Sequence, residues 1–252
     1  MALPLVLEVC VDSVGSALAS EKGGAQRVEL CSGLAEGGVT PSAGLIAMAR
    51  KRAAIPLHVL IRPRAGDFCY AADEFEVMKR DIVLAKQLGV NGVVFGILEL
   101  DGRVDVPRTR ELVDLARPLK VTFHRAFDAT ADLLTALEDV IRGGADRILT
   151  SGGGATAEEG AGVIASLVSA AQDRAIVMAC GAIREKNVRQ ILESTAVREV
   201  HANLQSPAPN LTSESGRISA SFVGGAIERP ELRPDTVASF LAAARGAPGT
   251  NS

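Results

Sequence analysis

Aromatic residues are scarce in this chain: they make up 3% of its 252 residues, with one tyrosine and no tryptophan. Basic residues are not in excess either, because 27 Lys and Arg stand against 30 Asp and Glu, for a formal net charge of -3. Surfaces that bind nucleic acids combine basic stripes with aromatic platforms on which bases stack. Since both features are lacking, we do not expect a nucleic acid among the partners of this protein.

Long apolar runs are lacking as well. No stretch approaches the roughly 20 apolar residues that a membrane-spanning helix requires. The first residues, MALPLVLEVC, carry no basic segment and reach Glu8 before an apolar run typical of a signal peptide is complete. None of the four cysteines forms a C-x-x-C pair. We therefore expect a cytoplasmic protein with reduced thiols and no membrane partner.

Short β-branched segments alternate with amphipathic segments along the chain, which is the pattern of repeated strand–helix units and a parallel sheet. Such units predict an α/β fold of the (β/α)8 TIM-like barrel type, with residues 1–245 as a single domain and 246–252 as a disordered tail. The expected strands are Leu5–Val11, Arg27–Cys31, Leu57–Arg64, Gly92–Ile97, Lys120–Arg125, Arg147–Ser151, Ala175–Cys180 and Arg198–Asn203.

A segment rich in Ser, Pro, Asn and Gly, residues 205–234, breaks this rhythm before a final helix from Asp235 to about Ala244. It predicts a long loop after the eighth strand. Because the carboxyl ends of the strands form the mouth of such a barrel, this loop is expected to lie over the mouth as a lid or binding loop.

Side chains alternate between the two faces of a strand, and the apolar set must face the surrounding helices. In the first strand that set is Val9 and Val11, which turns Glu8 and Cys10 toward the barrel axis. The same reasoning for the second, third, fifth and eighth strands turns inward Glu29, Cys31, Arg62, Arg64, His124, His201 and Asn203.

These inward polar residues lie late in their strands, at the end where barrel enzymes place their active sites. Buried charges are costly unless they are compensated, so a barrel does not collect them for packing alone. Two interpretations stay open: a ligand site, or an ionic plug of Glu8, Glu29, Arg62 and His124. His58 lies at the start of its strand and is expected to be a packed core histidine.

Cys10 and Cys31 lie at matching late positions of consecutive strands, which are about 4.8 Å apart in a sheet. Their sulfur atoms are therefore expected to approach each other. Two soft thiolates favour Cu(I) over Mg2+ or Ca2+. The alternative is that both thiols are simply small buried side chains.

A second hypothesis is acid–base chemistry. Glu8, Glu29 and His124 are candidate acids and bases for an isomerase, epimerase or lyase that acts on a small anionic carbonyl compound. No Lys lies late in a strand, which argues against a Schiff-base aldolase. The candidate substrate-binding residues are Arg62, Arg64, Arg125, Asp128, Ser151, His201 and Asn203.

Two further patterns could hold ligands at the mouth. Glu8, Glu29, His124 and His201 could together bind a divalent metal. The glycine-rich segment Ser151–Gly154 could cradle a phosphate through its backbone amides, although glycines are equally expected where a loop turns tightly.

Ordered motifs of the chain resemble the CutC copper homeostasis family. They are LEVCVDS at 7–13, RVELCSGL at 27–34, EGGVTPS at 36–42, IRPR at 61–64, GDF at 66–68, GVVFG at 92–96, VTFHRAFD at 121–128 and ILTSG at 148–152. Motifs of this length and order are far more specific than a single site signature.

The resemblance implies a (β/α)8 barrel, a cytoplasmic role in copper tolerance or storage, and a homodimer or homotetramer. It also implies Cu(I) binding, with the residues at positions 10 and 31 as the ligands, and both are cysteines here. Copper alone does not require the Glu, Arg and His side chains of the mouth, so an enzymatic site for a small anionic ligand remains the second hypothesis.

Overall fold

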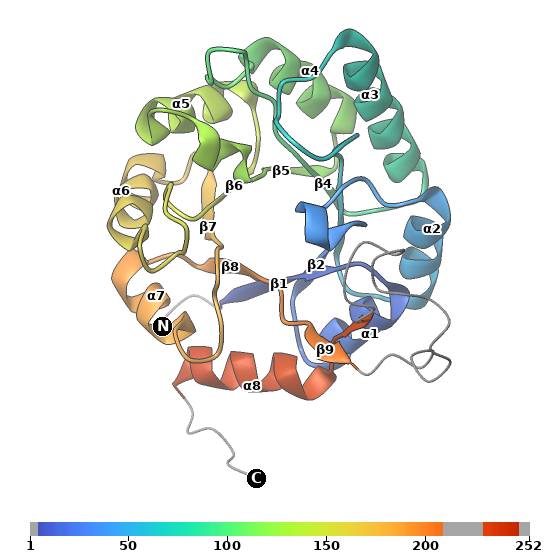
Figure 1. Ribbon diagram of the computed structural model, residues 1–252, viewed down its shortest axis with the longest axis vertical. Coiled ribbons are helices and arrows are strands. Elements are labelled where there is room, and N and C mark those ends of the chain that lie inside the picture. The colour runs from blue at the N-terminus through green and yellow to red at the C-terminus, as the bar shows by residue number, and fades with distance from the viewer. Residues whose placement is uncertain (1–4, 209–228, 247–252) are drawn as a thin grey trace, which may run out of the picture.

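Eight parallel strands close into a barrel in the order β1 to β8, and helices surround it (Figure 1). The structure, a computed structural model, describes residues 5–208 and 229–246. It confirms the predicted (β/α)8 architecture. The strands are β1 (Val6–Val11), β2 (Arg27–Leu30), β3 (Leu57–Leu60), β4 (Gly92–Phe95), β5 (Lys120–Phe123), β6 (Arg147–Thr150), β7 (Ile176–Ala179) and β8 (Glu199–Ala202).

Each strand is followed by a helix that packs on the outside of the barrel, and α8 contacts both α7 and α1 to complete the ring. Two short 3-10 helices, η1 (Leu34–Glu36) and η2 (Arg125–Ala129), lie in the loops at the mouth. The α-helices are α1 (Val14–Lys22), α2 (Ala43–Arg52), α3 (Ala72–Gln87), α4 (Val106–Ala116), α5 (Leu133–Gly143), α6 (Ala161–Ala171), α7 (Val188–Thr195) and α8 (Pro234–Arg245).

The alternation of side chains along the strands divides the interior into two parts. Leu7, Val9 and Val11 belong to the large apolar core between the strands and the helices. Cys10 and Cys31 face the opposite way and pack with Leu60 and Val94 inside the barrel. The polar side chains of the strands therefore share the barrel axis, as the sequence pattern predicted.

Several strands end earlier than expected. The third strand was expected to run to Arg64 but ends at Leu60, and the eighth ends at Ala202 rather than Asn203. The residues beyond these ends lie in loops, where strict alternation no longer applies. This difference decides which of the predicted residues reach the mouth.

The segment after β8 contains β9 (Ser206–Ala208), which pairs antiparallel with β10 (Arg229–Glu231) just before α8. The rest of the predicted long loop, residues 209–228, and the predicted tail at 247–252 lie outside the described residues. Among the helices of the described ranges, none combines the length and apolar character needed to cross a membrane.

Candidate functional site

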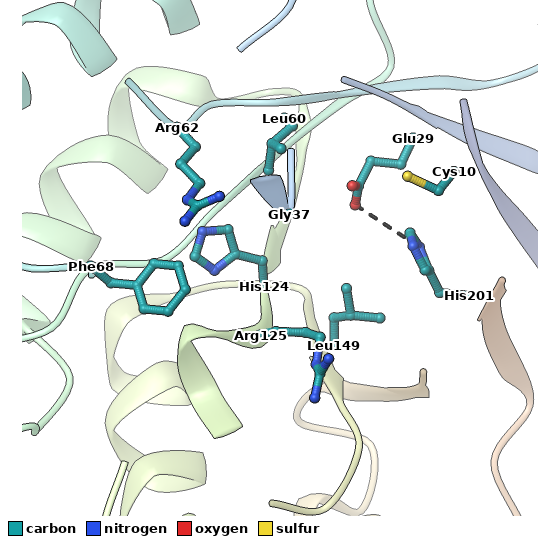
Figure 2. A pocket seen from close by; sticks show the side chains of 10 residues that line it. All are labelled: Cys10, Glu29, Gly37, Leu60, Arg62, Phe68, His124, Arg125, Leu149 and His201. Carbon is teal, nitrogen blue, oxygen red and sulfur yellow. Dashed lines mark ion pairs between the residues drawn. The ribbon is translucent and has the colours of Figure 1, made fainter. Parts of the chain in front are cut away.

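A cavity of about 270 Å³ opens at the carboxyl ends of the strands (Figure 2). Ligand sites of barrel proteins lie at this end. Two groups of side chains lie on opposite sides of it, with Leu60 and Leu149 between them. We call Cys10, Glu29 and His201 the donor wall, and Arg62, Phe68 and His124 the cationic wall.

The donor wall brings together three side chains that can bind a metal. One ligand atom from each of Cys10, Glu29 and His201 lies within 4.8 Å of the other two. The residues come from β1, β2 and β8, which are neighbours in the sheet. The sequence placed all three on the barrel axis but did not predict that they form one group.

Electrostatics differ sharply between the two carboxylates near this wall. Glu29 is buried, and among the described residues its ion-pair partner is His201 at 4.0 Å. Desolvation by burial outweighs the nearby positive charges and raises the pKa of Glu29 to about 7. Glu8 is also buried, but the charges of Arg27 and His201 overcome desolvation and hold its pKa well below its usual range. Ionisation is thus favoured for Glu8 and opposed for Glu29.

The thiols of Cys10 and Cys31 meet as predicted, with their sulfur atoms 3.7 Å apart. Cys10 lines the cavity, whereas Cys31 is fully buried behind it, with its Sγ 3.6 Å from the carbonyl oxygen of Val11. The hydrogen bond to Cys31 and burial both raise the pKa of Cys10. The Cys10 thiol is therefore protonated at neutral pH in the absence of a metal.

Arg62 on the cationic wall is held by backbone carbonyls rather than by a carboxylate. Its guanidinium donates to Glu36 O at 3.1 Å, Gly38 O at 2.7 Å and Gly66 O at 2.8 Å. It also lies 5.2 Å from the centre of the Phe68 ring. Within the described part of the chain its buried Nε has no hydrogen-bond partner. The positive charge is thus fixed in place but not neutralised.

His124 lies beside Arg62, with its ring 4.9 Å from the ring of Phe68. Its Nδ1 accepts a hydrogen bond from the backbone N–H of Ala126, so this nitrogen carries no proton. Burial, reinforced by the nearby Arg62 charge, lowers the pKa of His124 to about 3. His124 is therefore a neutral ring that offers an Nε2–H to the interior.

Deeper in the barrel lies a layer of buried charges that the sequence analysis missed. Arg27 contacts both Glu8 and Glu199 at 2.5 Å, and Arg147 contacts Glu199 at 2.7 Å. We call these four residues the ionic layer. An ionic plug therefore exists, but with Arg27, Arg147 and Glu199 as members instead of Glu29, Arg62 and His124. Extending the strand alternation to the first residue of β2, β6 and β8 would have found them.

Glu8 does not line the cavity, because it is fully buried in this layer and also pairs with His201 at 2.8 Å. The expected metal group of Glu8, Glu29, His124 and His201 is not assembled either, since His124 lies on the opposite wall. His58 is a buried interior residue, as expected, 3.8 Å from Glu8. Burial lowers the pKa of His58 to about 4.

Four of the predicted substrate-binding residues lie outside the cavity, and two of them, Arg64 and Asn203, follow the end of a strand. Arg64 follows the end of β3 and pairs instead with Glu74 at 2.6 Å and Asp67 at 3.0 Å. Asn203 follows the end of β8 and is exposed, with its side chain accepting from the backbone of Gln205. Both predictions extended the strand alternation into loops, where it does not hold.

Asp128 and Ser151 support the loop after β6 rather than line the cavity. Asp128 accepts hydrogen bonds from the side chain of Thr150, the backbone and side chain of Ser151, and the amide of Gly153. The Gly152 amide donates to Thr150 Oγ1 at 2.8 Å. These amides are engaged within the protein, so the glycine-rich segment is a tight turn and not a phosphate cradle. Arg125, which pairs with Asp128 and Ser151, does reach the cavity.

Comparison with known proteins gives a consistent result. The CutC family profile matches residues 5–206. The chain belongs to the CutC family. A Mus musculus relative named copper homeostasis protein cutC homolog is 50% identical over 201 residues, which cover 80% of this chain and 74% of the mouse protein. A CutC family protein of Xanthomonas campestris is 51% identical over 80% of this chain and 84% of its own length.

Solved structures agree with the family assignment. A Streptococcus agalactiae protein assigned to copper homeostasis as CutC matches with a TM-score of 0.74 and 31% identity, over 78% of this chain and 97% of its own. Phosphoribosylanthranilate isomerase from Thermotoga maritima matches with a TM-score of 0.58 over 96% of this chain and 99% of its own, but at only 14% identity. The second match shows the barrel fold alone. The CutC assignment thus rests on sequence and fold together.

Proposed function

We propose that this CutC protein binds Cu(I) through the thiolates of Cys10 and Cys31 and serves copper homeostasis. The observation that carries the proposal is the 3.7 Å separation of the two sulfur atoms, inside a barrel whose relatives are named for copper homeostasis. Thiolates are the soft ligands that Cu(I) prefers. Cys10 borders the cavity, which gives the ion a way in, and Cys31 lies behind it.

The cytoplasmic location and the homodimer or homotetramer implied by the family resemblance belong to the same proposal. Copper is the cargo of such a protein rather than a resident cofactor. The reduced thiols that the site requires are typical of the cytoplasm.

Anaerobic titration of the reduced protein with Cu(I), against a chromophoric competing chelator, tests the proposal. We expect one Cu(I) per chain, and at least about 100-fold weaker binding in Cys10→Ser and Cys31→Ser. Loss of a residue that only hydrogen-bonds to a metal ligand already costs about 10- to 100-fold in affinity, and loss of the ligand itself should cost more. Cys69→Ser is the matched control, since Cys69 is a half-buried thiol outside the cavity. Unchanged affinity in both ligand variants would show that copper binds elsewhere.

A second candidate function is conversion of a small anionic carbonyl compound, by an isomerase, epimerase or lyase reaction. Arg62 favours it, because its buried guanidinium lines the cavity and has no carboxylate partner among the described residues, which suits it to an anionic ligand. His124 can donate from Nε2 beside it, and Glu29 is the carboxylate that lines the same cavity. Cu(I) binding at the thiol pair has no use for these groups.

Calorimetric titration of the metal-free protein with pyruvate and with inorganic phosphate tests the anion site. We expect Arg62→Gln to weaken binding roughly 10- to 100-fold, the effect of losing a charged hydrogen bond. Arg64→Gln is the matched control, because Arg64 lies nearby in the same loop but outside the cavity. If neither probe binds, or if the two variants lose binding equally, the cationic wall is not an anion site.

A further inference from the structure

The donor wall has a composition that the thiol pair does not explain. Cys10, Glu29 and His201 offer one sulfur, one oxygen and one nitrogen within 4.8 Å of one another. Each of these atom types is a common zinc ligand, whereas Mg2+ and Ca2+ select oxygen donors and Cu(I) selects sulfur. Because the three residues lie on adjacent strands rather than on loops, the barrel fixes their positions.

Glu29 lacks the partners that a buried carboxylate needs. Its Oε2 makes no hydrogen bond within the described part of the chain, although the residue is only 5% exposed. The ionic layer offers no spare cation, because its two arginines are matched by its two glutamates. A divalent cation at the donor wall would neutralise both the Glu29 carboxylate and the Cys10 thiolate.

His201 is held in the orientation that metal-binding histidines adopt. Its Nδ1 lies 2.8 Å from Glu8 Oε1, a buried carboxylate that also pairs with Arg27. In the neutral ring, Nδ1 donates to this carboxylate and Nε2 carries no proton, so a metal that displaces the second proton can bind there. Carboxylate–histidine–zinc arrangements of this kind are common in zinc proteins.

We propose that Cys10, Glu29 and His201 form a zinc site with a fourth coordination position open to the cavity. Three protein ligands and one open position are typical of zinc sites that act on a substrate, whereas structural sites are closed by four protein ligands. The three side chains of the donor wall face the same cavity as the cationic wall (Figure 2), so the fourth position of a bound zinc would be accessible from that cavity. A small anion held by Arg62 could then offer a carbonyl or carboxylate oxygen to the zinc.

Cys10 belongs to both this site and the proposed copper pair. Because both ions would draw on the same Cys10 sulfur, we expect zinc and copper to compete for the protein. The second ligands differ, however, because Cys31 serves only copper and Glu29 serves only zinc. This difference allows the two proposals to be tested separately.

Zinc affinity of the anaerobic, reduced full chain tests the site, with Co2+ as a spectroscopic substitute. We expect one Zn2+ per chain, a thiolate-to-Co2+ charge-transfer band, and visible bands of four-coordinate Co2+. Glu29→Gln and His201→Gln should each weaken zinc binding at least about 100-fold. The remote control Cys69→Ser should change it less than about threefold, and Cys31→Ser should weaken it less than either ligand variant, since Cys31 contacts Cys10 but is not itself a ligand.

Three outcomes would overturn the zinc site: no zinc binding by the wild type, retention of the Co2+ bands in both Glu29→Gln and His201→Gln, or loss of zinc binding in Cys31→Ser equal to that in Cys10→Ser. Unchanged Cu(I) uptake by Glu29→Gln, together with an unchanged circular dichroism spectrum, would show that the variant is folded. If the copper proposal is wrong, only the Cu(I) titrations will show it. The Zn2+ affinities and the Co2+ spectra test the zinc site independently.

Discussion

His124 illustrates how a single buried side chain links stability to pH. Its folded-state pKa of about 3 lies below its ordinary value of 6.5, because burial and the Arg62 charge oppose protonation. Between these two values the unfolded chain binds the extra proton and the folded chain does not. The contribution of neutral His124 is therefore complete above about pH 6.5 and is lost as the pH falls toward 3.

We expect the wild type to lose stability relative to His124→Asn by about 1.4 kcal/mol for each pH unit below 6.5. Asn retains an oxygen that can accept from the Ala126 amide, so the variant removes mainly the titration. Urea unfolding of both proteins at pH 7, 5.5 and 4 measures the difference. Groups common to both proteins, including His58, largely cancel in this comparison. A constant difference across the pH range would contradict a buried neutral His124.

At the same scale, strand alternation predicted the direction of many side chains but not their roles. Cys10, Glu29 and His201 were correctly placed on the barrel axis, because each lies within or next to a regular strand. Arg64 was misplaced, since β3 ends at Leu60 and the following loop turns the guanidinium to Glu74. Strand ends depend on the pairing of neighbouring strands, which local sequence does not specify.

The loop between β6 and α6 holds one of the side chains that line the cavity. A side chain at Gly160 would place its Cβ only 1.8 Å from Ser151 O, because the backbone of the loop folds directly against itself. Ser151 in turn bonds to Arg125, a lining residue of the cavity. The glycines are needed for this close approach and not for a phosphate.

Gly160→Ala should therefore destabilise the protein by roughly 3 kcal/mol, because rigid backbone atoms must move to admit the methyl group. Gly162→Ala is a suitable control, since it lies nearby in α6 with no atom within 4 Å of the added Cβ. That variant should gain roughly 0.5–1 kcal/mol from the reduced freedom of the unfolded chain. Thermal and urea unfolding measure both effects, and equal stabilities would refute the steric argument.

Whether a segment forms a helix or a strand was predictable, because apolar residues recur at different spacings in the two. In α5, apolar side chains recur at helical spacing, Asp132 caps the first turn and Gly144 ends the helix. The residues of β9 and β10 were assigned to a loop, since only three residues of each strand pair. Such short pairings leave no periodic signal.

For the whole molecule, the barrel followed from the repeated strand–helix pattern, but the arrangement inside it did not. The separation of the donor wall from the cationic wall depends on where side chains from several strands meet. The ionic layer joins residues up to 172 positions apart, such as Arg27 and Glu199. Local patterns can indicate that Glu8 points inward, but only the closed barrel shows that Arg27 neutralises it.

The ionic layer also bears on how the barrel selects one alignment of its strands. A shift of β1, β2, β6 or β8 by one residue would turn a charged side chain from the axis into the apolar core beneath the helices. The shifted chain would bury that charge without its partner, at a cost of several kcal/mol. These four charges therefore favour a single strand register, because misaligned barrels that form during folding are destabilised by the unpaired charge.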